Sequence, residues 1–516
     1  MTDSMDRPVW LTQLLRPQAH PHACRDVRLV ETHISWLLLT GDYVYKLRRP
    51  VNFGFVDFST AERRQRDCYE EVRLNRHFTP ELYVGVVPVV RDAAGSIRVD
   101  VSGSPQGGGD LEVVEWAVRM HQFEPVHLVD TLLAGGRLNE AHFRRFGSEL
   151  ATQHEALPRR EASARDAAQA MLAPALDNFR VLGERCSPAL APRLHRLREA
   201  TQAAHAAIAR LARERLAAGF VRECHGDLHV GNLVLLDGRI RAFDCLEFNP
   251  GLRWIDTLSD VAFLVMDLVA RGQQALAYTF LDGYMDTCGD YDGLRMLNFL
   301  AAYRAMVRAK VAALGGNGGE PEQAGELARY LDEADRWLQG GRGELLICCG
   351  LSGSGKSFVA GQLVARLPAL RLRSDVLRKT MAGLSPDARG AAIYGSNMTA
   401  NVYDRLSALA DALVAQGHCV ILDATFLRAD PRLQARAMAQ ARGVPLHVLY
   451  CTAPLPVLRD RIRARQTGNT DPSDADLAVL DAQIQSFEAP DEADTVRVDT
   501  SRADAVDAVL RTLRPS

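Results

Sequence analysis

The sequence lacks long apolar runs, paired cysteine spacings and an excess of charge. No apolar stretch reaches the ~18 residues that a membrane helix needs. The closest, Leu258 to Ala270, contains Asp260 and Asp267, so we expect a buried helix there. The ten cysteines include no C-x-x-C pair, which favours reduced thiols over a disulfide framework or a zinc site. The stretch from Met1 to Pro21 holds no apolar signal segment, so we expect a cytoplasmic protein.

The charge balance argues against a dominant surface for binding polyanions. The net charge is −3, from 61 Lys+Arg and 64 Asp+Glu. This value does not support a nucleic-acid substrate, and nothing in the composition demands a membrane. The chain has 516 residues, 47% of them hydrophobic, which predicts two or three globular domains.

Two glycine clusters divide the chain. Residues 315–319 and 340–343 are rich in glycine and flank a helical stretch. We predict a first domain over residues 1–325, a linker helix and glycine hinge over 326–342, and a second domain over 343–516. The first domain reads as a small β-rich lobe followed, from about Asn139, by a large helical lobe. It is therefore predicted to be α+β.

The second domain alternates short apolar runs with helical text, which predicts an α/β fold with a parallel sheet and helices on both faces. The predicted strands are Glu344–Cys349, Leu370–Arg373, Cys419–Asp423, Leu446–Cys451 and Thr495–Val498. The predicted helices are Ser357–Leu367, Asp375–Ala382, Tyr394–Gln416, Pro431–Arg442, Leu455–Arg465 and Ala503–Leu513.

The first of these strands runs directly into a phosphate-binding motif. The motif is Gly350-x4-Gly355-Lys356-Ser357, and a helix follows it. Such glycines let backbone N–H groups converge on phosphate oxygens, and the helix N-terminus favours the same negative charge. The predicted nucleotide-binding residues are Gly350, Ser352, Gly353, Ser354, Gly355, Lys356 and Ser357. Lys356 would reach the β- and γ-phosphates, and the Ser357 hydroxyl would ligate Mg²⁺.

Three further residues of the second domain are candidates for catalysis. Asp423 ends an apolar strand, which suits a magnesium ligand. Asp375 ends another strand and is suited to accept the proton of an attacking hydroxyl, although a helix N-cap is the alternative. Arg465 belongs to an arginine-rich helix end before the polar segment Gln466 to Asp476, which we interpret as a lid. A solvated basic helix end is the alternative for Arg465.

This set of motifs resembles the small P-loop kinases, with the polynucleotide-kinase-like and zeta-toxin-like predicted kinases closest. The resemblance covers residues 343–516 and rests on the P-loop, Asp375-x-x-Arg378, Asp423-Ala424-Thr425-Phe426 and the arginine-bearing lid. It implies that Asp375 activates an acceptor hydroxyl and that a lid arginine contacts the nucleotide. A gluconate- or shikimate-kinase-like enzyme is an alternative within the same class.

The first domain carries a second, unrelated phosphotransfer motif. His225-Gly226-Asp227 is followed by Asn232, five residues after the aspartate, and then by Asp244 at the end of a predicted hairpin. In kinase chemistry such residues orient the acceptor hydroxyl and bind metal. We therefore predict Asp227 as catalytic, and Asn232 and Asp244 as metal ligands. A polar turn before a hairpin is the alternative.

This arrangement resembles the aminoglycoside/choline phosphotransferase branch of the kinase-like fold, over residues 25–315. The resemblance implies that Lys46 holds the α- and β-phosphates, that Glu71 (or Glu70) pairs with Lys46, and that Val113–Val118, with Glu115, is the hinge over adenine. The sequence departs from kinases in lacking G-x-G-x-x-G between the first two strands. Phosphate cover would then come from backbone N–H groups, Thr32 or Ser35.

The sequence thus predicts a bifunctional enzyme. Each domain would bind ATP and Mg²⁺ and transfer the γ-phosphate to a hydroxyl of a small molecule, or to a nucleic-acid end in the second domain. One alternative is a single active P-loop kinase with a regulatory or recruiting kinase-like domain. Another is an ATP-hydrolysing switch without an acceptor. Neither the acceptors nor the oligomeric state can be read from the sequence.

Overall fold

The computed structural model describes residues 7–54, 56–101, 111–161, 167–315, 321–386, 388, 395–468 and 476–514. The chain divides into two compact units. The first comprises Met1–Leu138, Leu157–Glu161 and Gly219–Asp256, and the second comprises Asn139–Ala156, Ala162–Ala218 and Thr257–Ser516. This division does not follow the predicted boundary, because the helices assigned to the first domain share a unit with the C-terminal sheet.

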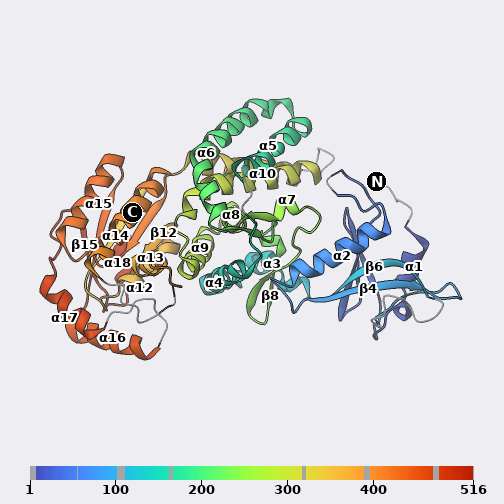
Figure 1. Cartoon of the computed structure of the whole chain (residues 1–516), viewed down its shortest axis with the longest axis horizontal. Helices are drawn as coiled ribbons and strands as arrows, with labels where there is room; N and C mark the ends of the chain where they lie inside the picture. Colours follow the sequence, from blue (N-terminus) through green and yellow to red (C-terminus); the bar gives the residue numbers. More distant parts are fainter. Residues whose placement is uncertain are drawn as a thin grey trace. The chain divides into compact units, whose positions relative to one another are not determined.

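An antiparallel sheet forms most of the first unit. Its described strands number six, in the order β1-β2-β3-β6-β4-β5, and helix α2 packs across β4 and β6 (Figure 1). The apolar segment over residues 27–40 forms two strands and not one, because residues 32–34 separate β1 from β2. The elements are α1 (Val9–Leu14), β1 (Arg28–Glu31), β2 (Ser35–Leu39), β3 (Tyr43–Arg48), α2 (Ala61–Asn75), β4 (Tyr83–Arg91), β5 (Ile97–Val99), β6 (Glu112–His121) and α3 (Val129–Ala134).

The rest of the first unit carries the predicted catalytic loop. Strand β7 (Val221–Glu223) precedes the loop and pairs with β10 (Trp254–Asp256), which follows the short helix α7 (Pro250–Arg253). A hairpin of β8 (Leu233–Leu236) and β9 (Arg239–Ala242) then joins Asn232 to Asp244, as predicted. The hairpin turn consists of Asp237 and Gly238, both with positive φ, a conformation that a two-residue turn requires.

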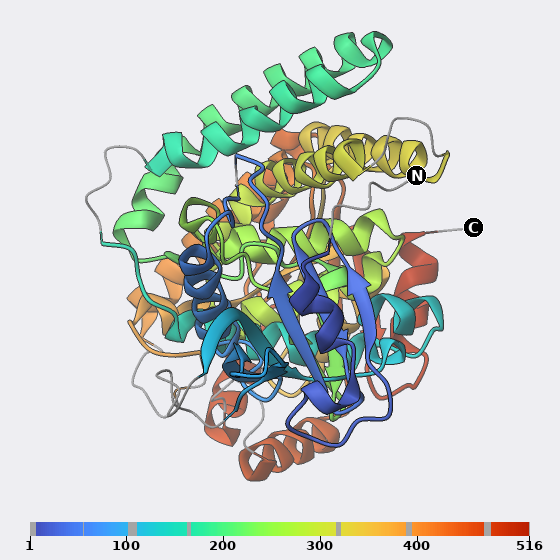
Figure 2. The ribbon, with the colours of Figure 1, turned by 90° about the vertical axis from the view of Figure 1, so that its right-hand side faces the viewer.

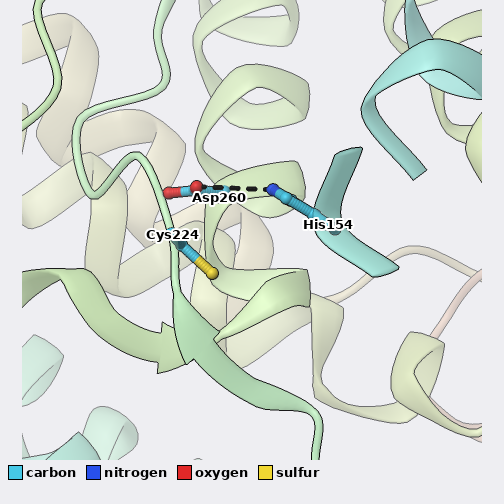
Figure 3. Close-up of side chains that lie close together, drawn as sticks. All are labelled: His154, Cys224 and Asp260. Atoms are coloured by element: carbon cyan, nitrogen blue, oxygen red, sulfur yellow. Dashed lines mark ion pairs between the residues drawn. The ribbon is translucent and has the colours of Figure 1, made fainter. Parts of the chain in front are cut away.

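Long helices make up the first part of the second unit. They are α4 (Glu140–Ala156), α5 (Ala167–Arg185), α6 (Ala191–Ala217), α8 (Thr257–Ala270), α9 (Gln274–Cys288), α10 (Leu297–Gly315) and α11 (Pro321–Gln339). Helices α5 and α6 lie against α10 (Figure 2), and α11 packs on α6, α8 and α10. Helix α8 is the predicted buried helix, and its Asp260 forms an ion pair with His154 of α4 at 3.6 Å (Figure 3).

A parallel sheet forms the second part of this unit. Its five described strands follow the order β12-β13-β11-β14-β15. All six residues of β11 are buried, which requires cover on both faces of the sheet and confirms the predicted α/β class. The elements are β11 (Glu344–Cys349), α12 (Lys356–Arg366), β12 (Ala369–Arg373), α13 (Ser374–Met381), α14 (Ser396–Ala415), β13 (Cys419–Asp423), α15 (Ala429–Arg442), β14 (Leu446–Thr452), α16 (Leu455–Gly468), α17 (Leu477–Ser486), β15 (Thr495–Asp499) and α18 (Ala505–Leu513).

Among the described residues, no helix combines the length and the apolar composition needed to cross a bilayer. This agrees with the charged residues inside Leu258 to Ala270, which α8 buries within the protein instead.

Candidate active sites

Lys46 lies in the middle of β3, and its ammonium group joins two carboxylates. Nζ is 2.8 Å from Oε1 of Glu71 on α2 and 2.6 Å from Oδ1 of Asp244. Glu71 is therefore the partner of the lysine, whereas Glu70 pairs with Arg73. Burial alone would lower the pKa of Lys46, but the charges of Asp244 and Glu71 raise it, so the lysine stays protonated. A cation held in this way is suited to bind phosphate oxygens.

Asp227 and Asn232 contact each other at the two ends of the catalytic loop. The Asn232 amide Nδ2 donates to the Asp227 carboxylate Oδ2 and to its backbone oxygen, both at 3.0 Å. Between them, the backbone N–H of Gly231 donates to Nδ1 of His229 at 3.1 Å, which tightens the turn. The Asp227 side chain keeps 36% of its surface exposed, so a substrate can reach the carboxylate.

The backbone around Asp244 is fixed by side chains of the neighbouring β-lobe. Asp244 has a φ of +61°, which is unusual for a residue other than glycine. Its N–H donates to the Tyr83 hydroxyl at 3.1 Å, and the next N–H, of Cys245, donates to Oδ1 of Asn75 at 3.0 Å. These bonds hold the strained conformation and direct a carboxylate that is 46% exposed toward Lys46.

Arg48 is a buried residue of this site that the sequence analysis missed. Its guanidinium contacts Asp67 at 2.5 Å, Glu71 at 2.6 Å and Glu247 at 2.5 Å. The spacing offered a signal, because residues two apart on a strand face the same side, so Arg48 shares the face of Lys46. An arginine on that face requires carboxylate partners once it is buried.

The charges of this cluster do not balance. Burial raises the pKa of Glu247 to about 8 and also raises the pKa of Asp67. Burial would raise the pKa of Asp244 as well, but Lys46 outweighs it and holds that pKa below its usual range. With a pKa of about 8, Glu247 is largely protonated near neutral pH, so the two cations face three charged carboxylates and one negative charge remains. The cluster consists of Lys46, Arg48, Asp67, Glu71, Asp244 and Glu247.

Two predictions for this site need correction. Glu115 lies inside β6, so it does not mark the hinge. Its carboxylate accepts a hydrogen bond from Nε of Arg64 at 2.8 Å. The strand continues to His121, which moves the connection between lobes to the residues after it. Ser35 is buried and bonded to Arg48 at 3.0 Å, so its hydroxyl is occupied by the protein itself.

The P-loop joins β11 to α12 in the predicted place. Gly350, Gly353 and Gly355 all have positive φ, and a Cβ on Gly350 would lie 2.4 Å from a backbone oxygen, so only glycine fits there. Ser352 donates its N–H to Oε1 of Gln483 on α17 at 2.8 Å. The hydroxyl of Ser354 is buried without a hydrogen bond to any described residue, as expected for a group that faces a ligand.

Lys356, Ser357 and Asp423 meet because β13 lies beside β11. Nζ of Lys356 donates to the carbonyl oxygens of Gly350 and Leu351 at 2.9 and 2.8 Å, and burial lowers its pKa. The Ser357 hydroxyl donates to Oδ1 of Asp423 at 3.0 Å. The Ser357 hydroxyl lies in the first turn of α12, and the Asp423 carboxylate lies at the end of β13. A hydroxyl and a carboxylate are the ligand types that Mg²⁺ uses in P-loop enzymes.

The predicted acceptor-side residues lie on helix α13, and the predicted lid arginine lies on helix α16. Asp375 lies in the first turn of α13, and the buried Arg378 donates to Thr399 at 3.1 Å. Arg465 lies on α16, and on the same helix Arg461 contacts the P-loop, with NH1 3.3 Å from the Gly353 oxygen. Most of the predicted lid, 469–475, lies outside the described residues.

Comparison with known families matches both halves of the chain. A phosphotransferase enzyme family model matches residues 35–297, which is just over half of the chain, and an AAA domain model matches residues 345–490. The chain therefore belongs to the phosphotransferase enzyme family. It is an ATP-dependent kinase in class, with a kinase-like N-terminal region and a P-loop C-terminal region, and nucleotide, divalent metal and a small-molecule substrate are what this class uses.

Relatives from mycobacteria match this chain over nearly their whole length. Uncharacterized proteins of Mycobacterium tuberculosis and Mycobacterium bovis are 29% identical over 477 residues, 91% of this chain and 92% of each relative. Among solved structures, amicoumacin kinase hAmiN is 15% identical with a TM-score of 0.36, covering 62% of this chain and 89% of that one. The Mycobacterium tuberculosis APS kinase CysC is 26% identical with a TM-score of 0.26, covering 34% and 98%.

Proposed function

We propose that the protein is a bifunctional phosphotransferase in which each site transfers the γ-phosphate of ATP to a hydroxyl group. The observation that carries the proposal is that the two sites share no residue. Each has its own phosphate-side lysine, acceptor-side carboxylate and metal-side carboxylate. These are Lys46, Asp227 and Asp244 in the first unit, and Lys356, Asp375 and Asp423 in the second.

In the first site, the oxygen of the acceptor hydroxyl attacks the γ-phosphorus while Asp227 accepts the proton of that hydroxyl, and ADP leaves. Lys46 holds the α- and β-phosphates and is itself held by Glu71 at 2.8 Å. Asn232 and Asp244 would hold Mg²⁺, which would offset the negative charge of the phosphates. The excess negative charge of the cluster favours a cation at this position.

In the second site, the backbone N–H groups of residues 350–355 cradle the phosphates at the N-terminus of α12. Lys356 leaves the loop carbonyls that it contacts and binds phosphate oxygens, because those carry the greater negative charge. Asp375 accepts the acceptor proton. Ser357 and Asp423 would hold Mg²⁺. Arg461, which contacts the loop, is a further candidate beside Arg465 for stabilising the transferring phosphoryl group.

The acceptors we propose are small hydroxyl compounds of the cytoplasm. The net charge of −3 supports these over a nucleic-acid end.

The test is transfer from γ-labelled ATP to a small-molecule extract, with products separated by mass spectrometry. Wild type is compared with Asp227→Asn and Lys356→Ala. We expect each substitution to remove a different labelled product by at least about 100-fold, because each removes a group needed only at its own site. Asp237→Asn, in the exposed turn between β8 and β9, is the matched control for Asp227→Asn and should leave both products unchanged.

Other outcomes identify the alternatives. A single product that only one substitution removes leaves one active kinase and one recruiting or regulatory unit. Release of free phosphate alone, removed by Lys356→Ala and spared by Asp375→Asn, contradicts phosphotransfer and indicates an ATP-hydrolysing switch.

A further inference from the structure

Two arginines of β12 lie beside the metal-side carboxylate of the P-loop site. Strands β12 and β13 are neighbours, with Arg373 in register with Asp423. NH1 of Arg371 is 3.6 Å and Nε of Arg373 is 3.5 Å from Oδ2 of Asp423. This oxygen is buried and accepts no hydrogen bond from the described residues, whereas Oδ1 accepts from Ser357. Oδ2 is therefore the atom available to a metal ion, and two cations stand next to it.

Carboxylates of helix α9 hold the same two arginines. Asp282 binds Arg371 through both oxygens, at 2.9 and 3.0 Å. Oδ2 of Asp286 is 2.5 Å from NH2 of Arg371 and 3.2 Å from NH1 of Arg373. Helix α9 packs on both α12 and β12, within one compact unit (Figure 1). One helix of the kinase-like region thus reaches the metal side of the P-loop site.

The cluster is electrically balanced. Arg144 of α4 also binds Asp282, and it contributes the third cation. Burial raises the pKa of Asp286, and it would raise that of Asp282 too, but Arg371 and Arg144 outweigh it there and hold the Asp282 pKa low. Three arginines (Arg144, Arg371 and Arg373) then face three aspartates (Asp282, Asp286 and Asp423). Removal of one aspartate leaves a buried positive charge beside the metal ligand.

We propose that Asp286, together with Asp282, is a positioning residue for the P-loop reaction, because it draws Arg371 and Arg373 away from Oδ2 of Asp423 and so leaves that oxygen to Mg²⁺. The proposal rests on the assigned P-loop site. The helical region of the first kinase then sets the Mg²⁺ affinity of the second site. The link is physical: the more tightly α9 holds the guanidinium groups of Arg371 and Arg373, the less they compete with Mg²⁺ for Asp423.

The test uses the full-length chain and measures nucleotide binding, so it does not depend on transfer to any acceptor. A fluorescent ATP analogue is titrated at increasing Mg²⁺ in an Asp244→Asn background, in which the P-loop is the remaining metal site. Asp286→Asn should raise the half-saturating Mg²⁺ about tenfold, because the arginines turn to Asp423 and repel the ion. The affinity for nucleotide at saturating Mg²⁺ should change by less than about twofold.

Two further variants separate positioning from mere support of the interface. Asp292 pairs with Arg405 of α14 in the same unit and, among the described residues, is not bonded to Arg371, Arg373 or Asp423, so Asp292→Asn is the matched control and should leave Mg²⁺ dependence unchanged. Arg373→Gln should lower the half-saturating Mg²⁺ on its own and should restore the Asp286→Asn variant to within about twofold of the background. 

The proposal is overturned if Asp286→Asn and Asp292→Asn shift the half-saturating Mg²⁺ concentration equally. It is also overturned by an Arg373→Gln variant with unchanged Mg²⁺ dependence, even where Asp286→Asn proves too unstable to measure. A chain that binds Mg²⁺ and nucleotide as expected but transfers no phosphate contradicts the proposed function and leaves this positioning role intact.

Discussion

At the scale of single residues, two glycines set the distance between α4 and α9. A Cβ on Gly147 would lie 2.2 Å from the backbone oxygen of Phe280, and a Cβ on Gly283 would lie 2.2 Å from that of Arg144. Both approaches are closer than any side chain allows, so the helices cross backbone to backbone. The same crossing brings Arg144 to Asp282.

We expect Gly283→Ala to destabilise the protein by about 3 kcal/mol, because α4 and α9 must separate to admit the methyl group. Gly183→Ala, on an open face of α5 with no atom near the added Cβ, should instead stabilise it by about 0.5–1 kcal/mol. Urea unfolding measures both. Equal effects of the two substitutions would show that the crossing tolerates a side chain.

At the scale of elements, the first strand of the parallel sheet is anchored by an ion pair. Glu344 is the first residue of β11. Its Oε1 accepts a hydrogen bond from NH1 of Arg514, which follows α18, at 3.0 Å, and lies 3.3 Å from Nε2 of His447 on β14. Burial alone would raise the pKa of Glu344, but these two partners lower it to about 2. The pairing ties the last helix of the chain to the start of the sheet.

This pKa predicts an acid-sensitive contribution to stability. Because the folded-state pKa lies below the unfolded value of about 4.5, the contribution is complete above pH 4.5 and is lost as the pH falls toward 2. Glu344→Gln should be less stable than wild type at pH 6 by on the order of 2 kcal/mol, and this difference should shrink toward pH 2. Thermal unfolding between pH 2 and 7 checks it, and a difference that is constant with pH would contradict it.

The elements and residues that the sequence predicted share one property, which is local context. The five strands of the second domain and the loop from Asp227 to Asp244 are encoded within short stretches, so their patterns are readable. Arg48 with Glu247, and Arg371 with Asp286, are 199 and 85 residues apart, and no local pattern pairs them. The hinge was misplaced because β6 extends to His121, and strand ends are set by pairing with β3 and β4 rather than by composition.

At the scale of the whole molecule, the helices of the kinase-like region and the P-loop sheet form one compact unit. Several polar contacts join them besides the arginine cluster. The Asn298 amide donates to the backbone oxygen of Gln416 at 3.1 Å, and the Gln416 amide donates to the backbone oxygen of Arg295 at 2.9 Å. Stability gained at one part of this unit is therefore shared with the other.

We expect nucleotide bound at the P-loop to protect helices α8, α9 and α10 from hydrogen exchange. Ligand at 100 times its Kd stabilises a cooperative unit by about 2.7 kcal/mol, which slows exchange through global opening roughly 100-fold. Lys356→Ala should abolish this protection, whereas Asp227→Asn should not. Protection confined to residues 344–365 would show that the two parts open independently.

The pairing of β12 with α9 also limits how the chain can be divided. A P-loop segment expressed without α9 would carry two buried guanidinium groups, of Arg371 and Arg373, that had lost Asp282 and Asp286 and lay beside Asp423. Such a segment should therefore be more stable when Arg371 and Arg373 are replaced by uncharged residues.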